Sequence, residues 1–265
     1  EVIPSEYNGG FGYGNNFAIR RALAGRDVPE YIYLLNSDAF PTENALAKLV
    51  AHMDEHSEVG IAGSYIHGVD GIPHRTAFRF PSVLSEFEDA MQLGLVTKLL
   101  HRFVVPLPLP DATTEVDWVA GASMMLRTTM LGEIGLFDET YFLYFEETDL
   151  CRRAKLAGWS IVYVRDSEVA HVGSATTGIQ DQRRRKPAFW FDSRQHYFVK
   201  NHGPLYLWLA NAAQLGGGAV FRARRILQGQ RESRPIPDHF LRDLVGHMAR
   251  TGLRAPMPRT GTGRA

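Results

Sequence analysis

Acidic and aromatic side chains concentrate in residues 137–149, the part of the sequence best suited to acid–base chemistry. Glu146, Glu147 and Asp149 stand at the start of a predicted helix, where carboxylates complement the positive end of the helix dipole, so a purely structural role is open. Alternatively, the preceding aromatic residues bury these carboxylates in part, and adjacent like charges then raise at least one carboxyl pKa. A raised pKa suits a general base, and we select Glu147 for that role, with Glu146 beside it.

Asp38 comes directly after the apolar run of residues 31–35, which we predict to be a central strand. In open α/β sheets, ligands bind beyond the carboxyl ends of the strands. A carboxylate at such an end suits Mg²⁺ or Mn²⁺, which take oxygen ligands and bridge diphosphate oxygens. The other interpretation is that Asn36, Ser37 and Asp38 cap a turn, and the sequence leaves both open.

His171 also follows a predicted strand, and glycine and hydroxyl residues come after it at 173–177. A histidine near a strand end is more often structural than a ligand, although small and hydroxyl residues behind it suit a phosphate or metal contact. The basic run at 183–186, which includes Arg184, is either a solvated face or a clamp for a diphosphate. Nucleic acid is the weaker interpretation, because the run lacks interleaved aromatic residues and the chain has a net charge of zero.

Residues 8–16 form a glycine cluster that reads NGGFGYGNN. Glycines allow backbone amides to approach a phosphate closely. The dinucleotide fingerprint fails here, however, because Asn15 occupies its third glycine position and no strand precedes the cluster. A surface turn before a helix at residues 17–24, capped by asparagines, is the simpler interpretation.

Periodicity over the first 165 residues predicts an α/β layer fold. Residues 31–35 and 59–63 read as strands around a helix at 45–53, an order that implies parallel pairing through a crossover. Further strands are predicted at 116–119 and 159–164, and a helix from Asp149 is expected to end at Gly158. Residues 68–114 contain five prolines and are expected to form an irregular excursion.

The composition of the chain indicates its domain size and the redox compartment that suits it. The chain has 265 residues, of which 45% are hydrophobic, enough for one large domain with an appendage. Cys151 is the single cysteine, which excludes an intrachain disulfide and cysteine-based zinc clusters and favours a reducing, cytoplasmic setting. The chain opens without Met and without the pattern of a signal peptide, so we interpret its start as a boundary within a longer protein.

Residues 201–250 are predicted to form a helical, basic tail, and residues 251–265 are expected to be disordered. The longest apolar stretch, at 204–221, contains polar residues and three consecutive glycines, which makes it a poor spanning helix. Peripheral contact with the inner face of the plasma membrane is easier to defend, because basic side chains follow this stretch at Arg222, Arg224 and Arg225.

Taken in order, these segments resemble the motifs of the family 2 glycosyltransferases, in particular the bacterial rhamnosyltransferase-like branch. Residues 8–16 resemble the family's N-x-G-F-G-x-G-N-N, and residues 34–38 resemble its metal-binding L-L-N-P-D. Residues 121–139 resemble the acceptor-side G-A-x-M-x-x-R and G-x-F-D-E. Residues 141–159 resemble F-F-x-Y-x-E-D-x-D-L-C-x-R and A-G-W, and residues 171–174 resemble the closing H-x-G-S.

This resemblance implies a GT-A type α/β sandwich over residues 1–200, with a mostly parallel central sheet flanked by helices. It implies inverting transfer of a sugar from a nucleotide diphosphate donor, dTDP-rhamnose first and a UDP-sugar second. The implied acceptor is a glycan or a lipid-linked sugar of a cell-envelope or polysaccharide pathway. Glu147 would deprotonate the acceptor hydroxyl, and Mg²⁺ or Mn²⁺ on Asp38, with His171 nearby, would stabilise the departing diphosphate.

The resemblance also assigns residues to the two substrates. The implied donor-binding residues are Gly12, Gly14, Asn15, Asn16, Asp38 and Arg184. The implied acceptor-binding residues are Asp117, Trp118, Gly121, Ala122 and Asp149. Trp118 would offer a stacking face for a sugar, and a position in the core explains it equally well.

Three departures from the family pattern bear on these expectations. Glu147 stands where the family usually has Asp, and Ser37 replaces its common Pro. The strand–helix–strand segment that contacts the nucleotide base is expected before residue 1. The alternative function is therefore a non-catalytic glycan- or partner-binding module on a glycosyltransferase scaffold. A nucleotidyltransferase is a weaker alternative. It would have a glycine-rich N-terminal loop with basic residues before the sheet, and no such loop is seen in this sequence.

Overall fold

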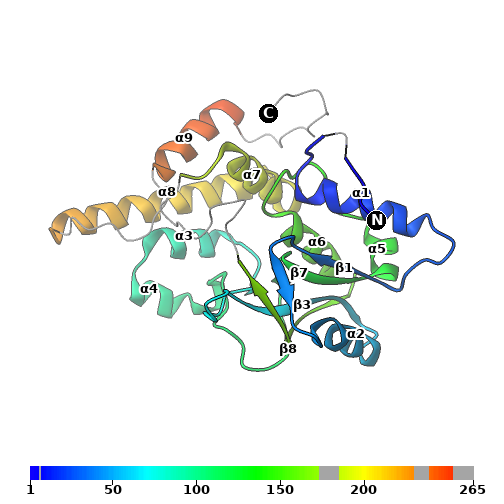
Figure 1. Cartoon of the computed structure of the whole chain (residues 1–265). Coiled ribbons are helices and arrows are strands. Elements are labelled where there is room, and N and C mark those ends of the chain that lie inside the picture. The colour runs from blue at the N-terminus through cyan, green and yellow to red at the C-terminus, as the bar shows by residue number, and fades with distance from the viewer. Residues whose placement is uncertain (6, 173–184, 230–238, 253–265) are drawn as a thin grey trace. The chain divides into compact units, whose positions relative to one another are not determined.

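The computed structural model describes residues 1–5, 7–172, 185–229 and 239–252, which divide into two compact units (Figure 1). The first, here called the sheet unit, contains residues 1–80 and 106–172. The second, the helical unit, contains residues 81–105, 185–229 and 239–252. Most of the segment expected to be disordered, residues 253–265, lies outside the described residues.

The sheet unit is built on a mixed sheet. Its strands run in the order β1 (Tyr31–Leu35), β7 (Ser123–Arg127), β3 (Val59–His67), β8 (Ser160–His171) and β2 (Ala39–Pro41), with β5 (Thr114–Glu115) paired to β8. The strands predicted at 31–35 and 59–63 are confirmed. Among the described strands, β3 and β8 pair in parallel and the other pairings are antiparallel, so the expectation of a mostly parallel sheet is wrong. The reason is that β7, from much later in the chain, lies between β1 and β3.

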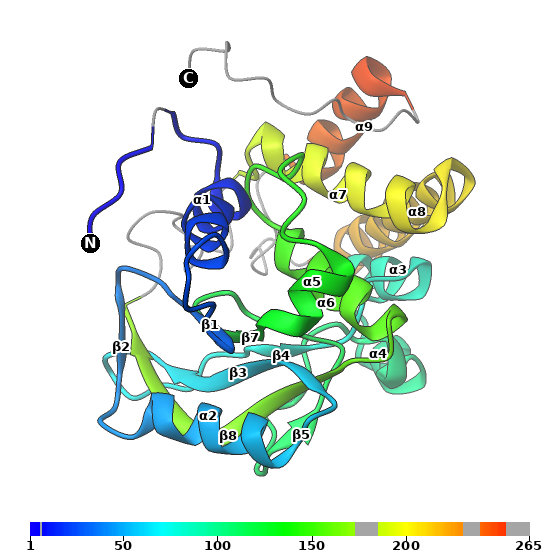
Figure 2. The same ribbon diagram turned by 90° about the vertical axis from the view of Figure 1, so that its right-hand side faces the viewer.

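Helices cover both faces of this sheet (Figure 2). Helix α2 (Ala45–Glu55) packs on one face, where its Leu49 and Met53 belong to the same buried cluster as Met125 of β7. Helices α1 (Phe11–Leu23), α5 (Thr128–Ile134) and α6 (Glu146–Leu156) pack on the other, against Met124 and Leu126. Alternate residues of a strand point to opposite faces, so the apolar run of β7 supplies both cores. The α/β sandwich is therefore confirmed.

Helix α1 begins at Phe11, six residues before the predicted start, and so contains Gly12 and Gly14. The cause is a long-range contact, in which the Phe11 amide donates to the Phe142 carbonyl at 3.0 Å. Gly10 has a φ of 90°, and a Cβ atom there would overlap the same carbonyl oxygen. The glycine cluster thus seats a helix start against the 141–145 segment, rather than forming an open turn.

The other predicted elements differ mainly in length. Helix α6 begins three residues earlier than expected, and its end at Gly158, with a φ of 94°, is confirmed. Strand β8 continues beyond residue 164 as far as His171. The irregular excursion contributes β4 (Ala77–Phe78), which pairs with β6 (Trp118–Val119) in a separate two-stranded sheet.

The helical unit combines the tail with part of the excursion. Its elements are α3 (Val83–Met91), α4 (Gly94–Leu99), a 3₁₀ turn (His101–Phe103), α7 (Ala188–His202), α8 (Pro204–Leu227) and α9 (Phe240–Thr251). Arg194 of α7 is buried and joins two other helices, because it bonds Glu86 of α3 at 2.9 Å and Asn211 of α8 at 2.6 Å. Residues 81–105 and helix α7, expected to belong with the sheet, therefore belong with the tail. Among the described helices, none has both the length and the apolar character needed to cross a membrane.

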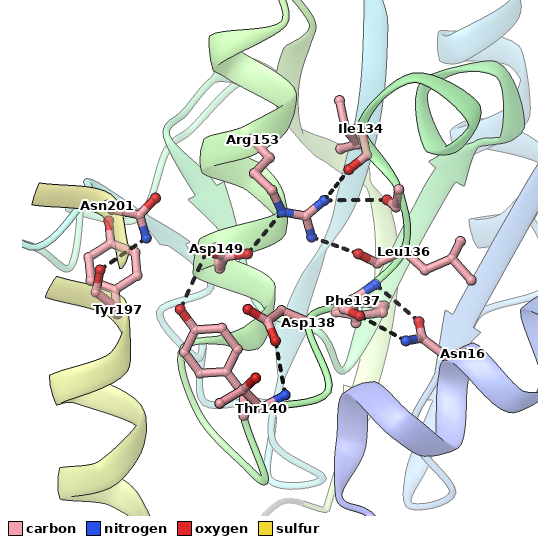
Figure 3. Close-up of polar contacts among 12 residues, drawn as sticks. Asn16, Ile134, Leu136, Phe137, Asp138, Thr140, Asp149, Arg153, Tyr197 and Asn201 are labelled. Atoms are coloured by element: carbon pink, nitrogen blue, oxygen red, sulfur yellow. Dashed lines mark hydrogen bonds and ion pairs between the residues drawn. The ribbon is translucent and has the colours of Figure 1, made fainter. Parts of the chain in front are cut away.

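A first prediction concerns the anchoring of α1. The buried Asn16 side chain donates to the Phe137 carbonyl at 2.8 Å and accepts from the Phe137 amide at 3.0 Å (Figure 3). Asn16→Ala would leave both backbone groups unsatisfied, so we expect the free energy of unfolding in urea to fall by about 2–3 kcal/mol. Asn15→Ala is the matched control, because within the described part of the chain the Asn15 side chain bonds only the Phe11 carbonyl of its own helix, and it should change stability by less than about 1 kcal/mol. Equal losses in the two variants would contradict this anchoring role.

Candidate active site

Asp38 and His171 meet at one edge of the sheet, as predicted. Asp38 follows β1, His171 ends β8, and the short strand β2 pairs Ala39 with His171. The His171 Nε2 atom lies 3.1 Å from Asp38 Oδ1, and the backbone amide of Val172 donates to the Asp38 carbonyl at 3.0 Å. The Asn36 side-chain amide lies 3.4 Å from the same ring nitrogen. Two strand ends far apart in the sequence thus hold a carboxylate and an imidazole in contact.

Two further histidines lie at this edge, and the sequence analysis missed both. His74 follows β3, and its ring stands edge-on to His171 with 6.3 Å between the centroids. Burial, and then the charge of His171, lower the pKa of His74. His67, the last residue of β3, bonds Glu168 of β8 at 3.1 Å. The signal that could have located them is the carboxyl end of β3, which extends four residues beyond the predicted strand.

The Asp38–His171 pair fits a divalent cation only in part. The described residues contain no group of three or more His, Cys, Asp and Glu side chains arranged to hold a metal ion. Mg²⁺, however, usually keeps several waters and is bound through one or two protein ligands together with substrate phosphates. One carboxylate and one imidazole at a strand end therefore suit a cation that a nucleotide diphosphate helps to bind.

The segment that carries the acidic motif is strained. Tyr144 and Phe145 have φ values of 71° and 69°, a left-handed conformation that is rare for bulky residues. Strain of this kind persists only where the surroundings enforce it, and it clusters at functional sites. Its structural effect here is that α6 begins abruptly at Glu146, with the Asp149 amide donating to the Phe145 carbonyl at 2.8 Å.

Asp149 is fully buried and anchors this turn (Figure 3). Its Oδ2 atom accepts from Arg153 Nε at 2.9 Å, and its Oδ1 atom lies 3.3 Å from the Tyr141 hydroxyl. The guanidinium of Arg153 also donates to the carbonyls of Ile134 at 2.6 Å and Leu136 at 2.7 Å. The observed contacts of Asp149 are thus internal ones that fix the start of α6.

Glu146 and Glu147 are held in a much less favourable setting. The Oε2 atom of each is buried and has no hydrogen-bond partner among the described residues. Burial, and then the charge of Glu147, raise the pKa of Glu146 well above its ordinary value. Burial also raises the pKa of Glu147, while its own backbone amide and that of Gly121 oppose the shift. A carboxylate whose pKa is raised toward neutrality is suited to accept a proton, the chemistry expected of Glu147.

Gly121 and Ala122 connect this carboxylate pair with Asn36, two residues before Asp38. The Gly121 amide contacts Glu147, and the Ala122 carbonyl accepts from the Asn36 amide at 3.0 Å. A Cβ atom at Gly121 would lie 2.8 Å from the Phe11 ring, so a glycine is needed where α1 approaches. These two predicted acceptor-site residues therefore lie between the two groups of candidate chemistry.

The remaining predicted acceptor residues make structural contacts. Asp117 accepts from the Phe80 amide at 3.0 Å and from Lys155 at 3.3 Å. The Trp118 ring stacks on Phe78 with 4.0 Å between the centroids, and its Nε1 donates to the Arg79 carbonyl at 2.9 Å. Both side chains remain partly accessible, so these contacts leave their acceptor-binding role as a prediction.

Of the four predicted donor-binding residues of α1, two are explained by packing and two remain at least partly accessible. Gly12 packs against Phe137, and Asn16 uses its side chain in the buried bonds described above, so packing explains both. Gly14 faces open space, and Asn15 is only partly buried. Arg184 lies outside the described residues.

Comparison with known proteins shows the family to which the chain belongs. The family model described as Glycosyl transferase family group 2 matches residues 31–222. The chain belongs to this family. It is 27% identical over 223 residues to the N-acetylglucosaminyl-diphospho-decaprenol L-rhamnosyltransferase of Mycobacterium tuberculosis, an alignment that covers 79% of this chain and 66% of that protein. It is 28% identical over 165 residues to the rhamnosyltransferase WbbL of Escherichia coli K12, with coverage of 61% and 60%. The chain thus spans slightly less than two-thirds of the length of either relative.

Among solved structures, the family 2 chain resembles GalNAc-T7, which was crystallised with UDP, GalNAc and Mn²⁺. The TM-score is 0.51 at 12% identity, and the match covers 94% of this chain and 46% of that one. Identity this low supports the fold alone. The GT-A type architecture expected from the sequence is therefore confirmed.

The buried carboxylates predict an unusual dependence of stability on pH. Because folding raises the pKa of Glu147 above its ordinary 4.5, the folded protein binds more protons than the unfolded chain above that pH. The contribution to stability is then complete below pH 4.5 and is lost as pH rises through the folded pKa. Glu147→Gln, which imitates the protonated form, should therefore raise the free energy of unfolding relative to wild type at pH 7.5.

This difference should shrink toward pH 4.5, as measured by urea unfolding at both values. Glu55→Gln, on the exposed end of α2, is the control and should show little dependence on pH relative to wild type. A Glu147→Gln variant that is less stable than wild type at pH 7.5 would contradict the conclusion that burial disfavours the charged form of this carboxyl group.

Proposed function

We propose that this chain carries the catalytic and metal-binding part of an inverting glycosyltransferase. The observation that carries the proposal is the buried Glu146–Glu147 pair, connected through Gly121, Ala122 and Asn36 to the Asp38–His171 pair. One pair is suited to receive a proton and the other to bind a cation and a diphosphate. Transfer of a sugar from a nucleotide diphosphate to a hydroxyl requires both functions.

In the proposed reaction, Glu147 takes the proton of an acceptor hydroxyl. The hydroxyl oxygen bonds to the anomeric carbon in line as the bond from that carbon to the diphosphate oxygen breaks, which inverts the configuration and releases the nucleotide diphosphate. Asp38 and His171 would hold Mg²⁺ or Mn²⁺, which when bound neutralises charge on the leaving diphosphate. Burial raises the pKa of Glu147, the charge of Glu147 raises the pKa of Glu146 beside it, and Asp149 keeps both carboxylates in position through Arg153.

The donor and acceptor are proposed from the relatives. Two of them are named as rhamnosyltransferases, and one name specifies a diphospho-decaprenol acceptor. We therefore propose dTDP-rhamnose as the first donor to test, UDP-sugars as the second, and a lipid-linked or other glycan of the cell envelope as the acceptor. Gly14, Asn15 and Arg184 remain proposed donor contacts, and Asp117, Trp118, Gly121 and Ala122 remain proposed acceptor contacts. A lipid-linked acceptor also calls for peripheral contact at the cytoplasmic face of the membrane.

Calorimetric titration with dTDP, UDP and GDP, each with and without Mn²⁺, tests the donor site. The titrations should use this chain and a form extended at its N-terminus. We expect one nucleotide diphosphate to bind more tightly in the presence of Mn²⁺. Asp38→Asn should lower its affinity in the presence of Mn²⁺ by at least about tenfold, because the substitution deletes a charged ligand of the cation. Asp27→Asn, at an exposed position, is the matched control and should bind as wild type. Failure of both forms to bind any of the three would favour a non-catalytic glycan- or partner-binding module.

A further inference from the structure

Four of the most exposed apolar side chains in the described chain belong to two segments of the helical unit. Leu95 and Leu99 lie one turn apart on α4 and are 75% and 79% exposed. Ile226 and Leu227 end α8 and are 80% and 87% exposed. Among the described large hydrophobic residues, only Val2, near the start of the chain, is more exposed than Leu227. Isolated apolar residues on a surface are common, but a group of them marks a binding surface.

Contacts between helices bring the two segments to the same end of the helical unit. Helix α8 lies on α3 so closely that a Cβ atom at Gly217 would be 2.8 Å from Ala90. Farther along α8, Arg224 donates to the Gln92 carbonyl, at the end of α3, at 2.9 Å. Leu95 and Ile226 therefore stand only three and two residues from this contact, and Figures 1 and 2 both show α4 beside α3. We call Leu95, Leu99, Ile226 and Leu227 the apolar end patch.

Charge is segregated around this patch. The whole chain is neutral, yet residues 90–110 and 193–231 contain no Asp or Glu. Within these two stretches, Lys98 and Arg102 flank the α4 leucines, and Arg222 and Arg225 precede the end of α8. Lys98, Arg102 and Arg222 are exposed. The charged residues of α4, of the 3₁₀ turn and of the end of α8 are therefore all cationic, while the carboxylate of Glu88 on the neighbouring α3 accepts a hydrogen bond from Thr97 of α4.

The combination of chemistry favours one kind of partner. Apolar side chains bordered by Lys and Arg match the boundary of an anionic bilayer, where the former enter the acyl region and the latter meet phosphate headgroups. A second copy of the chain in a two-fold contact would instead place like charges against each other. The remaining exposed face of α8 carries Leu205, Trp208 and Leu209 at its other end, and tryptophan is enriched at membrane interfaces.

We propose that α4 and the C-terminal end of α8 form one composite surface that binds anionic lipid bilayers, with the apolar end patch inserted and Lys98, Arg102 and Arg222 at the headgroups. This inference deepens the membrane contact of the proposed function by naming the residues and the lipid charge. It requires neither Glu147 nor a nucleotide, so the two proposals fail separately.

The test is co-sedimentation of the chain with vesicles of phosphatidylcholine containing 30 mol% phosphatidylglycerol, and with vesicles of phosphatidylcholine alone. We expect the wild-type chain to bind the anionic vesicles and to lose most of this binding in 0.5 M NaCl. The double variants L95E/L99E and I226E/L227E should each lower the partition coefficient by at least about tenfold, because a carboxylate neither enters the acyl region nor approaches anionic headgroups. The triple variant K98Q/R102Q/R222Q should lower it for anionic vesicles.

Leu156→Glu is the matched control, because Leu156 is 73% exposed on α6 in the sheet unit, and it should sediment as wild type. Circular dichroism melts should be unchanged for all variants, since the substituted side chains are exposed. Absence of wild-type binding to anionic vesicles, or wild-type binding by L95E/L99E, would overturn the proposal. Light scattering that shows a dimer dissolved by the same substitutions would overturn it in favour of a second copy. Nucleotide titration of L95E/L99E should match wild type, whichever way the membrane test falls.

Discussion

The ion pair between Asp149 and Arg153 is the interaction on which the geometry of the candidate site depends. Asp149 is fully removed from water, and its partner also satisfies the carbonyls of Ile134 and Leu136, where α5 ends. A buried pair of this kind adds little net stability, but removal of one partner leaves an uncompensated charge and destabilises by about 3–5 kcal/mol. The role of the ion pair is therefore to hold α6 in position rather than to add stability. It fixes the first turn of α6 against α5. The carboxylates of Glu146 and Glu147 are thereby held at buried positions that are unfavourable for a charged group.

Several energetically unfavourable features lie next to the Asp149–Arg153 ion pair. Tyr144 and Phe145 adopt left-handed backbone conformations, and Glu146 and Glu147 each bury an oxygen without a described hydrogen-bond partner. Helix α1 supports the strained turn from the other side, since Phe11 bonds the Phe142 carbonyl. A structural role in joining β7 to β8 does not explain why two adjacent carboxyl groups, those of Glu146 and Glu147, are buried in this segment. The same arrangement is explained if Glu147 must take up a proton near neutral pH.

The sequence was informative where local pattern decides the structure. The apolar run at 31–35, the amphipathic helix that follows and the glycine that ends α6 are all local signals, and each was predicted. The meeting of Asp38 and His171 was also foreseeable, because strand ends converge at one edge of a sheet. What could not be predicted depended on long-range contacts. The insertion of β7 between β1 and β3, the early start of α1 on Phe142, and the position of His74 beside His171 have no local signature.

The proposed role of Glu147 is tested most directly by sugar transfer in the full-length protein that contains this chain, compared between wild type and Glu147→Gln. The assay would use dTDP-rhamnose and a polyprenyl-diphosphate-linked N-acetylglucosamine acceptor, with nucleotide affinity measured in parallel. We expect an inverted product from wild type, and a loss of turnover of about 10²–10⁴-fold in the variant with nucleotide affinity unchanged, because only proton acceptance is removed. Wild-type turnover by Glu147→Gln would rule out Glu147 as the base, and a product that retains the configuration of the donor would rule out inverting transfer.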